Sequence, residues 1–292
     1  MVEQVRSFNR TVTEMIGALN HRYMGRDRPL GEARVLWEIG PDGCELAALK
    51  TRLGLDSGYL SRLLRALEAS GLIDVRENPR DRRARVVQLT TQGRRERATL
   101  DERSDALATS LLEPLTASQR ERLVSAMGEV ERLLTAASVK ITTMDPEHPD
   151  ACWCLEQYVA ELNRRSGRHF DPNVGATAMP HEVRPPAGEF FVAHLRGEPV
   201  GCGAVKHHDD SPAQIKRMWL APRVRGLGLG RRLLQRLEDG AHDAGARIAR
   251  IETNTDLHEA LSLYTSAGWI EVEPFNDEPF ADRWLEKALD DH

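Results

Sequence analysis

Three alternating glycines behind an arginine form the part of this sequence best suited to binding an anion. The run Arg225 to Gly230, RGLGLG, follows a strand predicted over 214–220 and leads into an amphipathic helix predicted over 231–241. Glycines remove side chains, so backbone N–H groups and the positive end of the helix dipole can surround a phosphate, worth roughly 0.3–1 kcal/mol per exposed charge. The run therefore predicts a diphosphate-binding loop.

Spacing separates three kinds of phosphate loop. A Walker loop needs Lys-Ser or Lys-Thr after its last glycine, whereas Arg231 and Arg232 follow here. A dinucleotide loop needs G-x-G-x-x-G, and the observed spacing is G-x-G-x-G. The R-x-x-G-x-G pattern of Arg225, Gly228 and Gly230 resembles instead the coenzyme A loop of GNAT N-acetyltransferases. A glycine-rich turn without a ligand is the alternative for the loop taken alone.

A second motif strengthens this resemblance. A helix predicted over 257–267 ends in Leu-Tyr-x-x-x-Gly-aromatic, which contains Tyr264 and Gly268. In GNAT enzymes this tyrosine is the general acid that returns a proton to the coenzyme A thiolate, so the resemblance implies that role for Tyr264. A phenol with an ordinary pKa of about 10 stays protonated at neutral pH. A core tyrosine is the alternative. The resemblance covers residues 145–289.

An acceptor amine must lose a proton before it attacks a thioester, so a base is also needed. Many GNAT enzymes carry a glutamate on the strand before the glycine loop, but Gln214 begins that strand here and cannot act as a base. Glu252, near the end of a strand predicted over 247–253, is the first substitute. It serves either as the base or as an anchor for the acceptor, and a water chain is a third route for the proton.

The resemblance also implies the ligand contacts. Backbone around 218–220 is expected to bind the pantetheine arm and polarise the thioester carbonyl. The residues predicted to bind acetyl-CoA, the acetyl donor, are Met218, Leu220, Arg225, Gly226, Leu227, Gly228, Gly230, Arg231 and Asn254. Asn276 and Glu278 are candidates for holding a cationic acceptor, and surface roles are equally expected. No metal is predicted, because the residues of 207–210 are consecutive and adjacent strand side chains point apart.

The first half of the chain shows a different pattern. A short helix predicted over 44–53 stops at Gly54, and Asp56 caps a second helix predicted over 57–70. Strand-like runs over 72–75 and 86–89 enclose an arginine-rich segment. Helix, turn, helix and basic hairpin together predict a winged helix-turn-helix, whose second helix enters the major groove of double-stranded DNA. A solvated charged hairpin on a non-binding domain is the alternative.

Asp81-x-Arg83, followed by Leu89-Thr90-x-x-Gly93, resembles the wing of MarR-type regulators. In that family the aspartate and arginine form a structural ion pair, which leaves other wing arginines to contact DNA. The residues predicted to contact DNA are Ser57, Tyr59, Ser61, Arg62, Arg65, Arg80 and Arg82. The resemblance covers residues 3–138.

Two long amphipathic regions flank this winged helix-turn-helix. One apolar stripe runs from Val5 to Tyr23, and a second runs from Leu100 to Leu134. Terminal helices of MarR-type proteins intertwine into a dimer, so the resemblance implies a homodimer that reads two half-sites. Packing within one chain is the alternative.

Charge also divides the 292 residues, because residues 1–140 carry a net charge of +3 and residues 141–292 a net charge of −8. We predict an α+β protein with a mainly helical winged helix-turn-helix domain over 1–140 and a GNAT α/β domain with a splayed mixed sheet over 145–290. The predicted function combines transcription regulation with acetylation of a small-molecule or protein amine. Two alternatives are a regulator that senses acetyl-CoA without turnover and an acetyltransferase whose first domain only dimerises. Neither a signal peptide nor an 18-residue apolar stretch is found, so a cytoplasmic location without membrane contact is expected.

Overall fold

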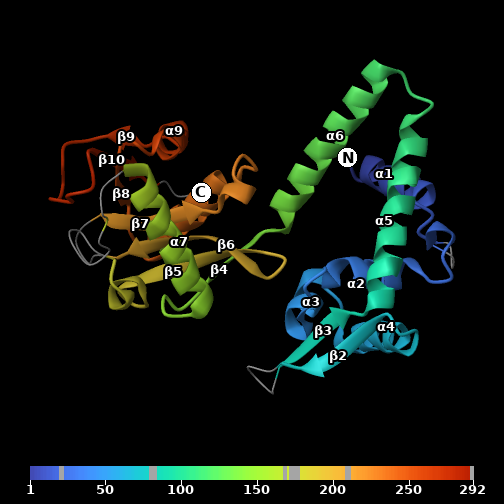
Figure 1. The fold of residues 1–292 in the computed structure, drawn as a ribbon. Helices are drawn as coiled ribbons and strands as arrows, with labels where there is room; N and C mark the ends of the chain where they lie inside the picture. The colour runs from blue at the N-terminus through green and yellow to red at the C-terminus, as the bar shows by residue number, and fades with distance from the viewer. Residues whose placement is uncertain (20–22, 79–83, 167–169, 171–177, 208–211, 290–292) are drawn as a thin grey trace. The chain divides into compact units, whose positions relative to one another are not determined.

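The computed structural model describes residues 1–19, 23–78, 84–166, 170, 178–207 and 212–289. The chain forms two compact units, Met1–Met127 and Gly128–His292, and the division falls inside one long helix. Figure 1 draws both units as ribbons. Each unit contains its own hydrophobic core. This two-unit α+β architecture confirms the predicted fold class.

The first unit is mainly helical with a small sheet. Its elements are α1 (Val2–Met15), η1 (Tyr23–Gly25), α2 (Leu30–Ile39), β1 (Cys44–Glu45), α3 (Leu46–Leu53), α4 (Ser57–Ala69), β2 (Ile73–Glu77), β3 (Arg85–Leu89), α5 (Thr91–Leu112) and the start of α6 (Ala117–Ser138). The three strands form an antiparallel sheet in the order β1-β3-β2.

Leucines at helical spacing build the core of this unit, because they place one apolar face of α3 and α4 inward. Leu49, Leu60 and Leu67 are almost completely buried. The predicted start of the first helix at position 44 is wrong. Cys44 and Glu45 pair with β3, so the backbone there is extended and α3 begins only at Leu46.

The helix cap predicted at Asp56 is present, and a second helix also begins with a side-chain cap. The Asp56 carboxylate accepts a hydrogen bond from the Tyr59 N–H at 2.8 Å and so caps α4. At the start of α6, Thr116 Oγ1 accepts from the Gln119 N–H at 3.3 Å, and Gln119 Oε1 accepts from the Thr116 N–H at 2.9 Å. This reciprocal capping box starts α6.

The apolar stripe of α1 is left uncovered within one chain. Its members are exposed, with exposed fractions of 58% for Val5, 44% for Phe8 and 44% for Met15. None of the residues of α1 is buried. The stripe is therefore available to a partner.

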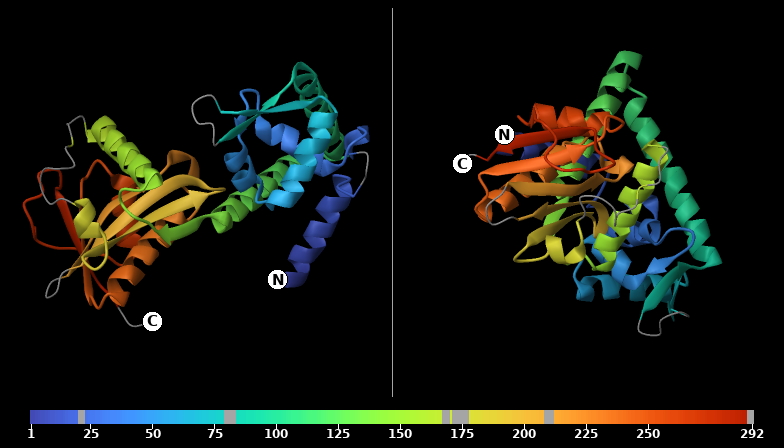
Figure 2. Two further views of the ribbon diagram at one scale, coloured as in Figure 1. Left: turned by 90° about the horizontal axis from the view of Figure 1, so that it is seen from below. Right: turned by 90° about the vertical axis from the view of Figure 1, so that its left-hand side faces the viewer.

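The second unit contains a seven-stranded mixed sheet. Its elements after α6 are β4 (Lys140–Thr143), α7 (Pro149–Ser166), η2 (Pro180–Val183), β5 (Gly188–Leu195), β6 (Glu198–Lys206), β7 (Ala213–Leu220), η3 (Pro222–Val224), α8 (Leu229–Asp243), β8 (Ile248–Thr253), α9 (His258–Ser266), β9 (Ile270–Glu271) and β10 (Arg283–Ala288). The strand order is β4-β5-β6-β7-β8-β10-β9. Helices α7 and α8 cover opposite faces of the sheet (Figures 1 and 2).

The sheet opens between β7 and β8, its parallel pair. These strands pair only at their beginnings, where Ala213 lies opposite Ala249 and Gln214 opposite Arg250. A bulge shifts the register of β7 against β6, and Arg217 there has a φ of 55°, which is rare for a residue with a side chain. The bulge and the short pairing confirm the predicted splay and create a cleft beside the ends of both strands.

Helix α8 lies at one side of this cleft and packs on the sheet through its apolar face. Leu233, Leu234 and Leu237 are fully buried in the core below the sheet. Arg232 donates from Nη2 to the Val139 carbonyl at 3.0 Å, and this bond attaches α8 to the residues that precede β4. Among the helices in the described ranges, none is both long and apolar enough to cross a membrane.

Candidate active site and candidate DNA interface

The glycine loop has the backbone geometry that glycine favours. Gly226 and Gly228 have φ values of 72° and 75°, which a side chain makes unfavourable. Gly228 is the N-cap of α8, and the Arg232 N–H, bonded to the Gly228 carbonyl at 3.3 Å, is the first to enter the helical pattern. The N–H groups before it have no acceptor inside the helix, so they form an anion-binding end.

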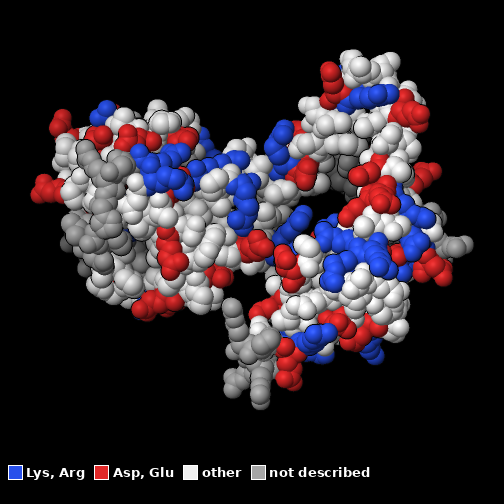
Figure 3. Space-filling model, viewed as in Figure 1, with Lys and Arg blue, Asp and Glu red and all other residues white. Residues whose placement is uncertain are grey.

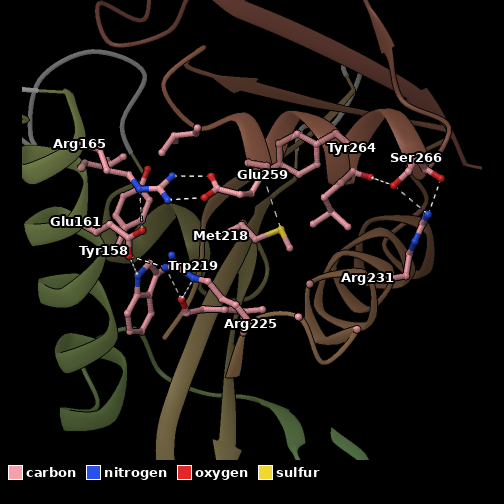
Figure 4. A pocket seen from close by; sticks show the side chains of 18 residues that line it. Tyr158, Glu161, Arg165, Met218, Trp219, Arg225, Arg231, Glu259, Tyr264 and Ser266 are labelled. Atoms are coloured by element: carbon pink, nitrogen blue, oxygen red, sulfur yellow. Dashed lines mark hydrogen bonds and ion pairs between the residues drawn. The ribbon is translucent and has the colours of Figure 1, made fainter. Parts of the chain in front are cut away.

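A cavity of about 520 Å³ lies against this loop, between α7, the end of β7 and α9 (Figure 4). We call it the larger cavity. Its wall contains the predicted residues Met218, Leu220, Arg225, Gly226, Gly228, Gly230, Arg231 and Tyr264. The loop, the strand end and the tyrosine therefore meet at one concave surface.

Tyr264 lies on α9 and is only 4% exposed. Its hydroxyl faces the Met218 sulfur at 3.9 Å. Burial raises the pKa of Tyr264 well above its ordinary value, and the nearby Tyr158 and Glu252 raise it further. The phenol is therefore protonated throughout the neutral range.

A smaller cavity of about 110 Å³ adjoins the larger one. The two share wall residues that include Tyr158, Met218 and Tyr264. The smaller cavity also contains the predicted residues Glu252, Asn254 and Glu278. Tyr264 thus lies where the two cavities meet.

An ion pair between Lys216 on β7 and Glu252 on β8 lies in the wall of the smaller cavity. Both side chains are more than nine-tenths buried, and burial lowers the pKa of Lys216 although Glu252 raises it. The second carboxylate oxygen of Glu252, Oε2, is buried and accepts no hydrogen bond from the residues that the structure describes. No sequence motif pointed to Lys216, which lies beside Arg217 in β7. Its burial is what requires a charged partner.

A second cluster of charges lies in the wall of the larger cavity (Figure 4). Glu161 on α7 accepts from Trp219 Nε1 at 2.9 Å and from Arg225 Nη2 at 2.5 Å. Arg165 lies 3.3 Å from Glu161 and forms two hydrogen bonds to Glu259 on α9, at 2.7 and 2.8 Å. Burial raises the pKa of Glu161, but the bonds from Arg225 and Trp219 outweigh it and lower that pKa overall. No sequence motif pointed to Glu161.

Four predicted ligand contacts have other partners. Leu227 packs into the core behind the loop and Asn276 accepts from Trp284 Nε1 at 2.9 Å, and neither is part of the described wall of either cavity. Asn254 lies in the smaller cavity rather than the larger, and its amide donates to the Phe280 carbonyl at 3.0 Å. Arg231, in the larger cavity, bonds to Ser266 Oγ at 3.3 Å.

The candidate DNA-reading residues share the outer face of α4. The side chains predicted to contact bases are all exposed, namely Ser57, Tyr59, Ser61, Arg62 and Arg65. The Arg62 guanidinium lies 5.6 Å from the centre of the Tyr59 ring. Acidic and basic side chains are interspersed on the face of this unit that Figure 3 draws.

The wing consists of β2 and β3, and the Asn78 N–H bonds to the Ala84 carbonyl at 2.8 Å near its tip. Arg80 and Arg82, with the expected ion pair of Asp81 and Arg83, lie outside the described residues.

Comparisons with known proteins found a family match in each half of the chain. The model of the acetyltransferase (GNAT) family matches residues 155–269, and the model of the MarR family matches residues 26–84. The IAA acetyltransferase of Azospirillum brasilense is 32% identical over 120 residues, which cover 41% of this chain and 78% of that protein. The chain belongs to the GNAT acetyltransferase family and carries a MarR-family domain in front of its acetyltransferase domain.

Solved structures of both kinds align with parts of the chain. Apo MarR from Escherichia coli is 26% identical, with a TM-score of 0.38, and covers 43% of this chain and 94% of its own. A GNAT family acetyltransferase from Elizabethkingia anophelis, solved with acetyl-CoA bound, is 16% identical with a TM-score of 0.37 and covers 52% of this chain and 99% of its own.

Proposed function

We propose that this protein transfers an acetyl group from acetyl-CoA to an amine and that its MarR-family domain binds double-stranded DNA as a homodimer. The observation that carries the enzymatic part is the meeting of the two cavities at Tyr264, one beside an anion-binding loop and the other beside a buried carboxylate. A donor and an acceptor held in these cavities would approach each other at that tyrosine. Acetyl-CoA would supply the activated acetyl group.

The larger cavity suits the donor. The first N–H groups of α8 have no acceptor inside the helix and can bind a diphosphate, and the glycines let it approach the backbone. The open end of β7, near Met218 and Leu220, offers backbone groups to a pantetheine arm because β8 does not pair with it there. These residues bind and orient the donor.

The smaller cavity suits a small amine. Its volume of about 110 Å³ lies below the roughly 300–1,000 Å³ typical of pockets for drug-sized ligands. Oε2 of Glu252, which has no hydrogen-bond partner among the described residues, can accept a hydrogen bond from an ammonium group, while Lys216 holds the other oxygen. Glu252 then acts either as an anchor or as the base that removes the ammonium proton.

Tyr264 supplies the proton for the leaving group. After the ammonium has lost one proton, the neutral amine nitrogen forms a bond to the acetyl carbon, the carbon–sulfur bond breaks, and the sulfur leaves as a thiolate. Tyr264 holds a proton at its hydroxyl oxygen, faces the position of the Met218 sulfur and donates that proton to the thiolate. The second proton, which the new amide nitrogen then loses, returns through solvent to the tyrosinate.

Replacing Gly228 with valine tests the donor site. Acetyl-CoA at 100 times its dissociation constant should stabilise the full-length parent protein by about 2.7 kcal/mol. Gly228→Val should abolish this stabilisation, because a branched side chain disfavours the φ of 75° and would project toward the diphosphate. Thermal unfolding with and without acetyl-CoA measures both effects.

Gly245→Val is the matched control, since Gly245 also has a positive φ, at 95°, but follows the far end of α8. An unchanged ligand-induced shift in Gly228→Val would refute the assignment of the loop. A screen of amines for release of free coenzyme A thiol, with and without DNA, tests turnover. Binding of acetyl-CoA without thiol release from any amine would favour the sensing function.

The DNA-binding proposal is supported by the exposed polar face of α4 and by the uncovered stripe on α1. A dimer formed through that stripe would present two copies of α4 to two half-sites. Arg62 and Tyr59 are the proposed base contacts, with Arg80 and Arg82 on phosphates.

The proposed DNA contacts predict different effects for substitutions of a base contact and of a phosphate contact. Arg62→Ala should change which operator sequence is preferred, because a base contact is worth about 1–3 kcal/mol of discrimination. Arg82→Ala should weaken binding to all sequences and lower the salt slope by about one, because it removes a phosphate contact. Gel-shift titrations over a salt series, with DNA from upstream of the gene and unrelated duplexes, measure both quantities. Equal, sequence-independent losses in both variants would contradict direct readout, and absence of binding at low salt would favour a dimerisation-only role.

A further inference from the structure

Arg225, the arginine of the glycine loop, forms hydrogen bonds to other residues of the protein. Arg225 donates from Nε and Nη2 to the Leu220 carbonyl, at 2.9 and 2.7 Å, and from Nη2 to Glu161 at 2.5 Å. Figure 4 shows these bonds connecting the loop to the end of β7 and to α7. Two of its nitrogens are thus occupied by protein oxygens, so Arg225 fastens the beginning of the loop.

Glu161 is the centre of this arrangement. Glu161 is only 7% exposed, and its carboxylate contacts Trp219, Arg225 and Arg165. It lies in the wall of a cavity proposed to hold a dianionic diphosphate, where a negative charge by itself opposes binding. Its three partners therefore point to a role in building the site rather than in contacting the ligand.

We propose that Glu161 is a positioning residue for the donor: by holding Arg225, it sets the glycine loop in the conformation whose N–H groups bind the diphosphate. This inference rests on the proposed function, because it takes the larger cavity to be the acetyl-CoA site. Arg225 acts through the loop and not as a phosphate ligand. The Glu161 carboxylate, which lies on α7, holds the Arg225 guanidinium beside that helix. The backbone N–H groups of the glycine loop then face the diphosphate.

A competing arrangement predicts the opposite change in the affinity for acetyl-CoA when the Glu161 charge is removed. If Arg225 turned to the diphosphate on binding, Glu161 would compete with the ligand for it, and removal of the Glu161 charge would tighten binding. If Glu161 positions the loop, the same change loosens binding. The direction of the change in affinity therefore decides between the two.

Glu161→Gln in the full-length protein is the test. Glutamine keeps an acceptor oxygen for Trp219 but loses the charge that binds Arg225. The substitution therefore weakens mainly the contact that holds the glycine loop. We expect the dissociation constant for acetyl-CoA, measured by calorimetry, to rise about 10-fold or more, as for loss of a charge-assisted hydrogen bond. The Michaelis constant for acetyl-CoA should rise in parallel, with kcat within about twofold of the parent.

Two comparisons make this result specific. Glu156→Gln, an exposed change on the same helix, should leave the dissociation constant unaltered. S-acetylpantetheine, which lacks the diphosphate, should retain its kcat/KM in Glu161→Gln to within about twofold, because the loop does not contact it. The double variant with Arg225→Gln should bind acetyl-CoA about as weakly as the weaker single variant, since both changes disrupt one unit.

Other outcomes overturn the inference. Tighter or unchanged binding of acetyl-CoA by Glu161→Gln would show that Glu161 does not position the loop. Equal losses for acetyl-CoA and S-acetylpantetheine would assign the effect to general disruption of the cavity, again against the proposal. Failure of the parent protein to bind acetyl-CoA would instead contradict the proposed function itself.

Discussion

Tyr264→Phe should lower kcat by about 10²- to 10⁴-fold, the usual contribution of a general acid, while the dissociation constant for acetyl-CoA stays nearly unchanged. The change removes only the hydroxyl and leaves the ring, which packs 6.1 Å from the ring of Trp269. Burial raises the pKa of Tyr264, so the parent enzyme keeps this proton at neutral pH. Single-turnover measurements, in which chemistry limits the rate, provide the comparison.

Tyr158→Phe is the matched control, because Tyr158 is the other tyrosine in the walls of both cavities. The large loss should appear in Tyr264→Phe and not in Tyr158→Phe. The reverse pattern would assign the acid to Tyr158. Parent-like turnover in both variants would leave Tyr264 with a packing role and contradict the mechanism.

Lys216→Met should destabilise the second unit by about 3–5 kcal/mol, the usual cost of leaving one member of a buried ion pair without its partner. Glu252 would keep a buried carboxylate whose Oε2 already has no described partner. Urea unfolding followed by tryptophan fluorescence measures this loss, since Trp37 is the only one of the five tryptophans outside the second unit.

The double variant Lys216→Met/Glu252→Leu should recover most of that stability, because two apolar side chains can replace a buried ion pair at little cost. Acetyltransferase activity should remain low in the double variant, since Glu252 is then absent. A loss of less than about 1 kcal/mol in the unfolding free energy of Lys216→Met would contradict this expectation. It would mean that water reaches the ion pair and solvates the Glu252 carboxylate in place of Lys216.

The parts of this protein that sequence alone determined are those whose physics is local. Alternating glycines, a capping aspartate at position 56 and leucines at helical spacing each act within a few residues, so the loop, α4 and α9 were predicted close to their observed bounds. Non-local pairing explains the exception, because Cys44 and Glu45 join a strand far along the chain, which a helical pattern cannot reveal.

The charge partners were decided only by the tertiary structure. Lys216 lies 36 positions before Glu252, and Glu161 lies 64 before Arg225, so no spacing rule connects either pair. The short pairing of β7 with β8 and the packing of α7 on the sheet bring these side chains together. In the sequence Glu161 looks like any acid on an amphipathic helix, and only burial, which makes an unpaired charge costly, gives it a specific partner.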